Sequence, residues 1–374
     1  MSAANESNRP VSVGEIDSNL RVETSLNLPE TDWRDVRAGA FQIYGLCPPV
    51  PGDVFRRIPE SVATATSAGV TAMHTCTAGG RIRFRTDSPF VALKVGMPNP
   101  GLFSHMTVMG TAGFDLYLVD GTSARFSAVF MPPMEIHGGY ESMVTLPGGR
   151  MMRELLVHMP LYSGVSELYI GLEAGSQLLP GSRYAEREPI VFYGSSITQG
   201  GCAARPGSAY TNLISRVLNT DHINLGFSGS ACGEPAIVRH MASLPMSAFV
   251  CDYDHNAPTP EHLEQTLWPL YTAIRTAHPD IPYLFVSKPD FHRDPALNAR
   301  CRAVVRDAFE RAQVAGDRQV AFVDGERLFD GPFYSECTVD TCHPTDLGFS
   351  RMAAVIGRQL AELLQLPFDD TMLS

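Results

Sequence analysis

From about residue 186 onward, the sequence repeats one pattern five times: a short apolar segment, a loop and, in most repeats, an amphipathic segment of helical length. Short apolar strands that alternate with amphipathic helices are joined by right-handed crossovers, and they form a parallel sheet with helices on both faces. The sequence therefore predicts a flavodoxin-like, three-layer α/β/α domain over residues 186–374. The expected strands are 189–193, 222–225, 247–251, 283–286 and 320–323, and the expected helices are 209–218, 260–277, 296–314 and 347–364.

The first half of the chain has a different pattern. Short apolar runs at 81–85, 90–95, 114–119 and 167–172 alternate with clusters of Gly, Pro and Ser, and helical periodicity is almost missing. Strands of this length and spacing are typical of a β-sandwich or jelly roll. We expect a jelly-roll-like β-sandwich over residues 26–185, preceded by a loosely ordered segment over residues 1–25.

The charge balance restricts the partners of the chain. The 40 acidic residues outnumber the 29 basic ones, which gives a net charge of −11 and argues against nucleic acid and against a polybasic membrane contact. No apolar stretch approaches the length of a membrane-spanning helix, and the polar N-terminus lacks the apolar segment of a secretory signal. We therefore expect a cytoplasmic protein. The sequence leaves the oligomeric state open, with a homo-oligomer among the possibilities.

Metal and cofactor motifs are missing from the sequence. There is no HExxH, no CxxC pair and neither of the glycine-rich phosphate-binding motifs, so we expect no metal and no organic cofactor. Asp252, Asp254 and His255 crowd one strand end, where a carboxylate-lined rim is a better interpretation than a metal site. The eight cysteines are expected to be reduced in the cytoplasm. The close pair Cys337 and Cys342 leaves one possible disulfide open.

The candidate chemistry follows the strands. Ligands of an open α/β sheet bind at the carboxyl ends of its strands. The segments that follow four of the expected strands supply a serine, a glycine, an asparagine and an Asp/His pair, which are the parts of a serine nucleophile with its base and oxyanion donors. These segments are 194–200, 226–230, 252–256 and 340–344.

Each part has a physical reason to be there. A serine at a strand-to-helix turn exposes its hydroxyl and directs its own N–H toward a developing oxyanion. Gly229 lets a second N–H approach closely because no Cβ stands in the way, and the Asn256 amide can give a third hydrogen bond. Asp340 and His343 are three residues apart, so one turn can bring the carboxylate to the imidazole. Each signal alone is weak, since turns and caps use the same residues; the joint occurrence in chain order carries the hypothesis.

This ordered set resembles the SGNH (GDSL-type) hydrolases, whose four blocks carry Ser, Gly, Asn and His on a three-layer α/β/α domain. The resemblance implies that Ser196 is the nucleophile, that His343 is the base and that Asp340 orients the base. It also implies an oxyanion hole formed by the N–H groups of Ser196 and Gly229 and by Asn256. The sequence departs from the family in having Ser195 where an Asp commonly precedes the nucleophile.

A second match extends the resemblance to the first half of the chain. Residues 113–117, Gly-Phe-Asp-Leu-Tyr, resemble the GxDLY motif of a β-domain that precedes this kind of hydrolase domain. The two-domain subgroup is similar to bacterial carbohydrate acetyl esterases, which implies a serine esterase acting on acyl esters of small or oligomeric carbohydrates, and a β-domain that helps to shape the active-site mouth. Arg205 either holds a substrate hydroxyl or carboxylate or forms a loop-stabilising ion pair. The alternative functions are a lactonase or small-ester hydrolase of sugar-acid metabolism and a non-catalytic carbohydrate-binding protein.

Overall fold

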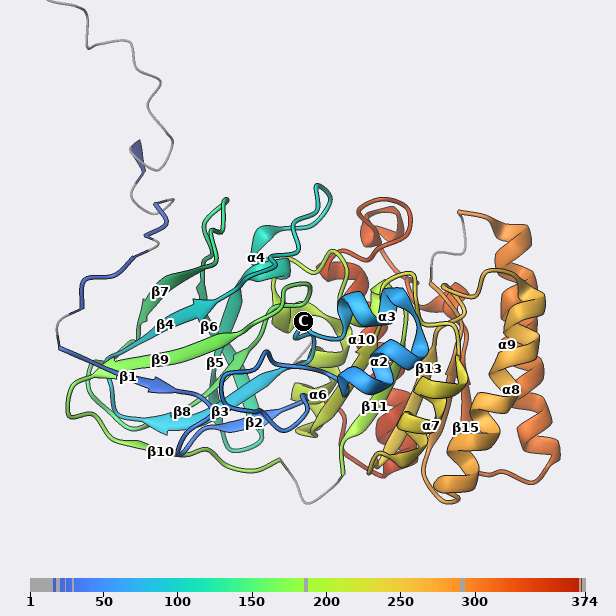
Figure 1. Ribbon diagram of the computed structural model, residues 1–374. Coiled ribbons are helices and arrows are strands. Elements are labelled where there is room, and N and C mark those ends of the chain that lie inside the picture. Colours follow the sequence, from blue (N-terminus) through green and yellow to red (C-terminus); the bar gives the residue numbers. More distant parts are fainter. Residues whose placement is uncertain are drawn as a thin grey trace, which may run out of the picture.

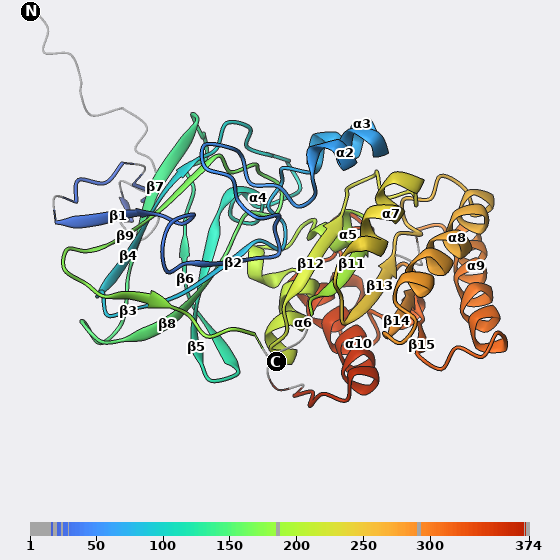
Figure 2. The same cartoon turned by 60° about the horizontal axis from the view of Figure 1, so that its bottom comes forward.

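The computed structural model describes residues 16–17, 21–23, 25–28, 30–184, 188–289, 293–369 and 371. Figures 1 and 2 show two halves side by side, a β-rich half formed by the first part of the chain and an α/β half formed by the second. The segment 1–25, which we expected to be loosely ordered, lies largely outside the described residues. A boundary between the halves near residue 185 remains our proposal.

The β-rich half contains two antiparallel sheets. One sheet has the order β1-β9-β4-β7, and the other has the order β10-β3-β8-β5-β6 with β2 paired to β3. Side chains from both sheets, including Phe84 of one and Ile170 of the other, form a single buried cluster, so the expected β-sandwich is confirmed. The strands are β1 (Thr31–Asp35), β2 (Gln42–Tyr44), β3 (Arg81–Thr86), β4 (Phe90–Gly96), β5 (Phe114–Asp120), β6 (Ser123–Phe130), β7 (Gly139–Thr145), β8 (Arg153–His158), β9 (Glu167–Glu173) and β10 (Leu178–Pro180).

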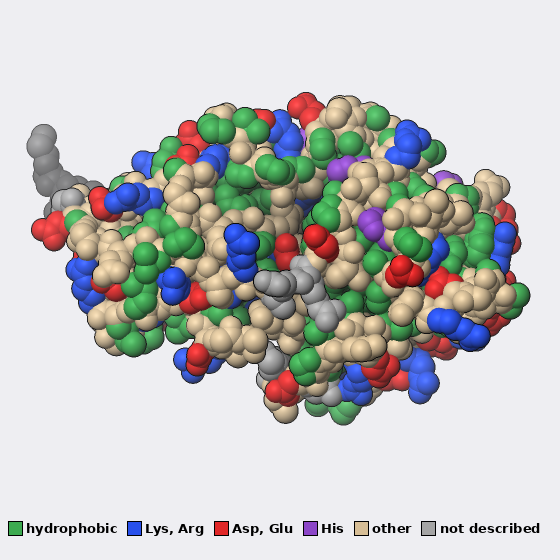
Figure 3. Space-filling model, turned by 90° about the horizontal axis from the view of Figure 1, so that it is seen from below, with side chains coloured by type: hydrophobic (Ala, Val, Ile, Leu, Met, Phe, Trp, Pro, Cys, Tyr) green, Lys and Arg blue, Asp and Glu red, His purple; other side chains and the backbone are tan. Residues whose placement is uncertain are grey.

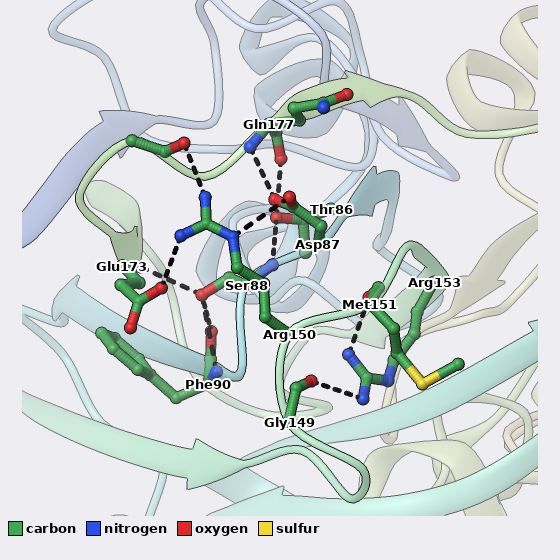
Figure 4. A network of polar contacts seen from close by, with 11 residues as sticks. Thr86, Asp87, Ser88, Phe90, Gly149, Arg150, Met151, Arg153, Glu173 and Gln177 are labelled. Carbon is green, nitrogen blue, oxygen red and sulfur yellow. Dashed lines mark hydrogen bonds and ion pairs between the residues drawn. The ribbon is translucent and has the colours of Figure 1, made fainter.

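Arg150 joins three connections of the sandwich (Figure 4). Its guanidinium donates to Asp87 in the β3–β4 turn at 3.3 Å, to Glu173 at the end of β9 at 2.9 Å and to the Gly175 carbonyl at 2.7 Å. The Arg150 side chain is 46% exposed, so this surface network contributes at most about 1 kcal/mol per pair.

The α/β half is built on a parallel sheet with the order β12-β11-β13-β14-β15. Successive residues of β11 point to opposite faces: Ile190 and Phe192 join the cluster under α6 and α10, and Val191 and Tyr193 join the cluster under α7, α8 and α9. The expected flavodoxin-like three-layer domain is therefore confirmed. Its elements are β11 (Ile190–Gly194), α5 (Ser196–Gln199), η3 (Pro206–Ser208), α6 (Tyr210–Leu218), β12 (His222–Gly226), α7 (Pro235–Ser243), β13 (Ala248–Asp252), α8 (Pro260–Ala277), β14 (Tyr283–Val286), α9 (Pro295–Val314), β15 (Val320–Val323), η4 (Gly325–Arg327), η5 (Tyr334–Cys337) and α10 (Asp346–Leu364).

The structure corrects the expectation that the first half is almost free of helix. It contains α2 (Glu60–Thr66), α3 (Ala68–Met73) and α4 (Val108–Ala112), which are five to seven residues long and too short to show a helical period. Ala63 of α2 and Val70 of α3 belong to the buried cluster of the α/β half, and both views place these helices against that half. The first part of the chain therefore completes the core of the second.

Three further features bear on the sequence-based expectations. All eight cysteines are free thiols, so Cys337 and Cys342 are not joined in a disulfide. Among the described residues, no helix combines the length and the apolar character needed to cross a membrane. On the face seen in Figure 3, Lys and Arg side chains are interspersed with Asp and Glu side chains rather than gathered into a basic stripe.

Candidate active site

The nucleophile candidate lies at the turn between β11 and α5. Ser195 caps α5, because its Oγ accepts a hydrogen bond from the Ile197 N–H at 3.1 Å. Ser196 is the first residue of that helix and is 6% exposed. Its N–H has no partner within the helix and is free to face a ligand. Ser195 therefore supplies the helix cap at the position where the family commonly has an Asp.

The structure brings Ser196, His343 and Asp340 together in one hydrogen-bonded chain. Ser196 Oγ lies 2.8 Å from His343 Nε2, and His343 Nδ1 lies 2.8 Å from Asp340 Oδ2. The backbone N–H groups of Cys342 and His343 donate to Asp340 Oδ1 at 3.1 and 2.7 Å. Thr341 has a φ of 68°, which turns the chain tightly enough for the carboxylate to meet both. The arrangement is that of a nucleophile, a base and an orienting acid.

The pKa shifts of Asp340 and His343 suit His343 to accept a proton. Burial would raise the pKa of Asp340, but hydrogen bonds from the His343 backbone and ring outweigh it, so the pKa is lowered and the carboxylate stays ionised. Hydrogen bonding to Cys342 raises the pKa of His343 despite partial burial, with a further contribution from Asp340. The ring is thereby held as a stronger base than an isolated histidine.

Gly229 and Asn256 lie in the loops that follow β12 and β13. Gly229 has a φ of +64°, and a Cβ at this position would meet no atom within 4 Å. No protein atom crowds this position, so within the protein the left-handed backbone conformation is what favours glycine here. That the missing Cβ lets the Gly229 N–H approach an oxyanion stays a prediction. Asn256 Nδ2 donates to the Phe227 carbonyl at 2.8 Å, which ties its side chain to the Gly229 loop and leaves it one further N–H.

The buried carboxylate of Asp252 is hydrogen-bonded to the helix that begins at the nucleophile, α5. Asp252, at the end of β13, accepts hydrogen bonds from Thr198 Oγ1 of α5 and from Tyr210 OH at 2.7 Å. Gly194 makes room for it, since a Cβ there would lie 1.6 Å from Asp252 Oδ1. Burial raises the pKa of Asp252 to about 7. The expected carboxylate-lined rim is wrong for Asp252 and Asp254, which are 7% and 2% exposed.

Arg205 lies where the two halves meet. Its guanidinium donates to Asp115 Oδ2 of β5 at 3.0 Å, contacts Tyr117 OH and lies over the Phe126 ring at 4.1 Å. These contacts match the ion-pair interpretation of Arg205. Contact between Arg205 and a substrate stays a prediction.

Several residues beside the triad were missed by sequence reasoning. Tyr162 OH donates to the Ser196 carbonyl at 3.2 Å, and the His105 ring lies 5.5 Å from the His343 ring between centroids. Cys342 Sγ lies 3.1 Å from His255 Nε2. Burial would raise the pKa of the Cys342 thiol, but hydrogen bonds to His255 and His343 lower it to about 7. Tyr162 and His105 belong to the first half of the chain, and no local pattern marks them.

Comparison with known families matches both halves of the chain. Residues 187–361 match the GDSL-like lipase/acylhydrolase family, and residues 31–178 match the family described as the N-terminus of SGNH hydrolase-type esterases. Among curated proteins, none matches the chain.

Solved structures share this two-part architecture. A GDSL-like lipase from Bacteroides ovatus, described as putative, is 26% identical with a TM-score of 0.81, and the match covers 91% of this chain and 99% of that one. A salicylyl-acyltransferase from a tetracycline biosynthetic pathway is 22% identical with a TM-score of 0.74, covering 92% and 100%. A family two carbohydrate esterase from Clostridium thermocellum, solved with cellohexaose, is 16% identical with a TM-score of 0.61, covering 87% and 99%.

The two family matches follow one another along the chain in the order of the two halves of the structure, and the site lies in the second of them. The chain therefore belongs to the SGNH (GDSL-type) hydrolases that carry an N-terminal GxDLY domain, and it is a carboxylic ester hydrolase.

Proposed function

We propose that the chain hydrolyses acyl esters of carbohydrates, above all acetyl esters, through an acyl-enzyme formed on Ser196. The observation that carries the proposal is the hydrogen-bonded chain from Ser196 Oγ through His343 to Asp340, with two distances of 2.8 Å. In this proposal Ser196 is the nucleophile, His343 is the general base and acid, and Asp340 orients the ring and stabilises its cation.

The reaction would run in two balanced steps. Ser196 Oγ forms a bond to the acyl carbon while His343 Nε2 takes the hydroxyl proton. The bond between the acyl carbon and the sugar oxygen then breaks, and His343 returns the proton to that oxygen. A water molecule repeats the sequence on the acyl-enzyme, so acid and alcohol leave and the serine is restored.

The oxyanion of each tetrahedral intermediate needs preorganised donors. We assign this role to the N–H groups of Ser196 and Gly229 and to Asn256 Nδ2. The helix start at Ser196, the left-handed backbone at Gly229 and the hydrogen bond that fixes Asn256 to Phe227 support the assignment. Each donor of this kind is worth roughly 10²–10³ in kcat.

The surroundings of the triad support a substrate with a sizeable alcohol part. A hollow of about 600 Å³ opens beside the Asp340 loop and is lined by Arg293, Phe329, Tyr334 and Thr341. On the β-rich side, Phe103 is 44% exposed and stands next to His105. Aromatic faces next to polar groups suit a sugar ring, and the cellohexaose bound to the Clostridium thermocellum esterase shows that a relative of this fold accepts an oligosaccharide.

Hydrolysis of p-nitrophenyl acetate tests the proposed chemistry. We expect turnover by the wild type and a loss of at least about 10³-fold in Ser196→Ala. Ser243→Ala, an exposed serine at the end of α7, is the matched control and should retain full activity. An inactive wild type, or an active Ser196→Ala variant, would contradict the mechanism.

A second assay tests the substrate class. Acetylated xylo-oligosaccharides and sugar lactones are compared at equal concentrations with the same preparation. Faster release of acetate than of hydroxy acid is the result expected for a carbohydrate esterase. Faster lactone opening would favour the lactonase alternative.

A cytoplasmic location and a homo-oligomeric state remain predictions. Cell fractionation tests the location, and light scattering tests the oligomeric state.

A further inference from the structure

His343 is surrounded by a group of metal-binding side chains that the proposed esterase reaction does not use. Cys202 Sγ and one ring nitrogen each of His105 and His343 all lie within 4.8 Å of one another. The three residues come from different parts of the chain: the β4–α4 connection, the loop after α5 and the loop before α10. Two imidazoles and one thiol form a ligand set that favours zinc over calcium or magnesium.

We propose that His105, Cys202 and His343 bind one Zn²⁺ ion, which inhibits the esterase by occupying the catalytic base. The zinc site itself does not depend on the proposed function; only the inhibition does. Three protein ligands leave the fourth tetrahedral position to water or substrate.

The hydrogen bonds of His343 indicate which nitrogen would bind the ion. Nδ1 is held by Asp340 at 2.8 Å, so Nε2 remains for the metal. A zinc-bound histidine characteristically donates its other N–H to a carboxylate, and Asp340 already stands in that position. Nε2 is also the atom that lies 2.8 Å from Ser196 Oγ. Zinc binding and proton transfer from Ser196 therefore exclude each other.

The other two ligands are already close to each other. The Cys202 Sγ–H donates to the His105 carbonyl at 3.4 Å, and Thr107 Oγ1 donates to the Ala204 carbonyl at 2.8 Å, so the two loops are joined on either side of the thiol. Ligand atoms of tetrahedral zinc are separated by roughly 3.4–3.6 Å. Closing the group from within 4.8 Å needs a movement of about 1 Å, which the exposed His105 side chain can make by rotation.

The backbone conformation at Cys202 favours glycine over cysteine, which is consistent with a functional role for the thiol. Cys202 has a φ of 72°, a left-handed conformation that is unfavourable for a residue with a Cβ and that glycine adopts freely. The positions before it, 200 and 201, are glycines, so the loop could have used one more.

A second group shares His343 and must be separated from the first. Asp340, Cys342 and His343 also place ligand atoms within 4.8 Å of one another. In that group Asp340 already accepts from His343 and from two backbone N–H groups, and Cys342 already contacts His255. The exposed His105 side chain and the Cys202 thiol are less constrained by hydrogen bonds, so we place the ion with them.

The test is a titration of the reduced, EDTA-treated full chain with Zn²⁺ against a chromophoric chelator. We expect one tight site in the wild type and in Ser196→Ala, which lacks the nucleophile but keeps all three ligands. His105→Ala and Cys202→Gly, the latter favoured by the φ of 72°, should each weaken zinc binding at least about tenfold. His137→Ala, an exposed histidine of the β-rich half, is the matched control and should bind zinc as the wild type does.

Activity gives the second readout. Zinc should inhibit p-nitrophenyl acetate hydrolysis with a midpoint equal to its dissociation constant, and EDTA should restore the rate. Absence of a zinc site in an active wild type, or unchanged affinity in both His105→Ala and Cys202→Gly, would overturn the inference. So would loss of zinc in Cys342→Ser alone. Zinc binding by a chain without esterase activity would instead overturn the proposed function and leave the site standing.

Discussion

Asp115 and Arg205 form an ion pair across the two halves of the molecule, with 3.0 Å between Asp115 Oδ2 and Arg205 Nη1. The same carboxylate accepts from the Gly207 N–H at 2.8 Å and lies 3.0 Å from His158 Nδ1. Asp115 is completely buried, which alone would raise its pKa, but the interaction with His158, followed by those with Arg205 and Arg216, keeps the pKa lowered. The Asp of the GxDLY motif therefore holds the loop that follows the nucleophile helix.

Removal of the Asp115 carboxylate should lower the stability of the protein far more than removal of an exposed carboxylate does. Asp115→Ala leaves Arg205 and the Gly207 N–H without their partner, and we expect a loss of about 3 kcal/mol in the free energy of unfolding. Asp120→Ala, at the exposed end of the same strand, should change it by less than about 0.5 kcal/mol. Urea unfolding followed by circular dichroism measures both. Equal stabilities of the two variants would show that the Asp115 network does not support the fold.

Asp252 should make the stability of the protein depend on pH. Its pKa is raised from 3.8 to about 7 by burial, so the folded state binds this proton more tightly than the unfolded state does. The protonation of Asp252 contributes a few kcal/mol to the free energy of unfolding. This contribution is complete below about pH 4 and is lost as the pH rises through about 7. Asp252→Asn cannot titrate, and its unfolding free energy should fall less between pH 5 and pH 8 than that of the wild type. Parallel profiles for the two proteins would contradict the raised pKa.

Gly229 and Gly121 offer a matched pair of substitutions. Both have a positive φ, +64° and +60°, and at neither position would an added Cβ meet an atom within 4 Å, so alanine should cost each about 1–2 kcal/mol of stability through the backbone alone. Gly121 lies in the β5–β6 turn, far along the chain from the triad. Only Gly229→Ala should also lower kcat, by about tenfold or more, because the oxyanion N–H is displaced. Equal kcat values in the two variants would remove Gly229 from the oxyanion hole.

Asp340 should act through His343 rather than on the substrate. Asp340→Asn keeps the shape of the side chain but loses the charge that stabilises the imidazolium, so kcat should fall by about 10²–10⁴ while KM changes little. Asp330→Asn is the control, because Asp330 is an exposed acid of a neighbouring loop. Steady-state kinetics on p-nitrophenyl acetate measure both constants. A variant that loses affinity but keeps kcat would point to substrate binding instead.

Most of the fold of the second half could be predicted because its signals are local, although α7 was not among the expected helices. Apolar runs such as 283–286 and 320–323 became strands with the same bounds, and the helical period of 260–277 gave α8 without error. Helices α2 and α3 were missed because a helix of six or seven residues has fewer than two turns in which to show a period. Their stability comes from packing against the α/β core, which no local pattern records.

The candidate site likewise contains residues that local sequence signals could place and residues that they could not. Ser196, Asp340 and His343 follow strands, and the rule that sites gather at the carboxyl ends of a parallel sheet was enough to place them together. His105 and Tyr162 come from the β-rich half, and their position beside His343 and Ser196 depends on how two separately patterned halves pack. The role of Asp252 was missed for another reason: an acid after a strand looks the same in sequence when it faces solvent and when it is buried under a helix.

The most direct test of the proposed mechanism is the identity of the residue that carries the covalent intermediate. The protein is treated with diethyl p-nitrophenyl phosphate, which phosphorylates an activated serine, and the modified peptide is identified by mass spectrometry. We expect one adduct per chain, on Ser196, no adduct in Ser196→Ala, and slow labelling in His343→Ala, because the base that activates the hydroxyl is missing. An adduct on another residue, or rapid labelling without His343, would contradict a mechanism in which Ser196 is activated by His343.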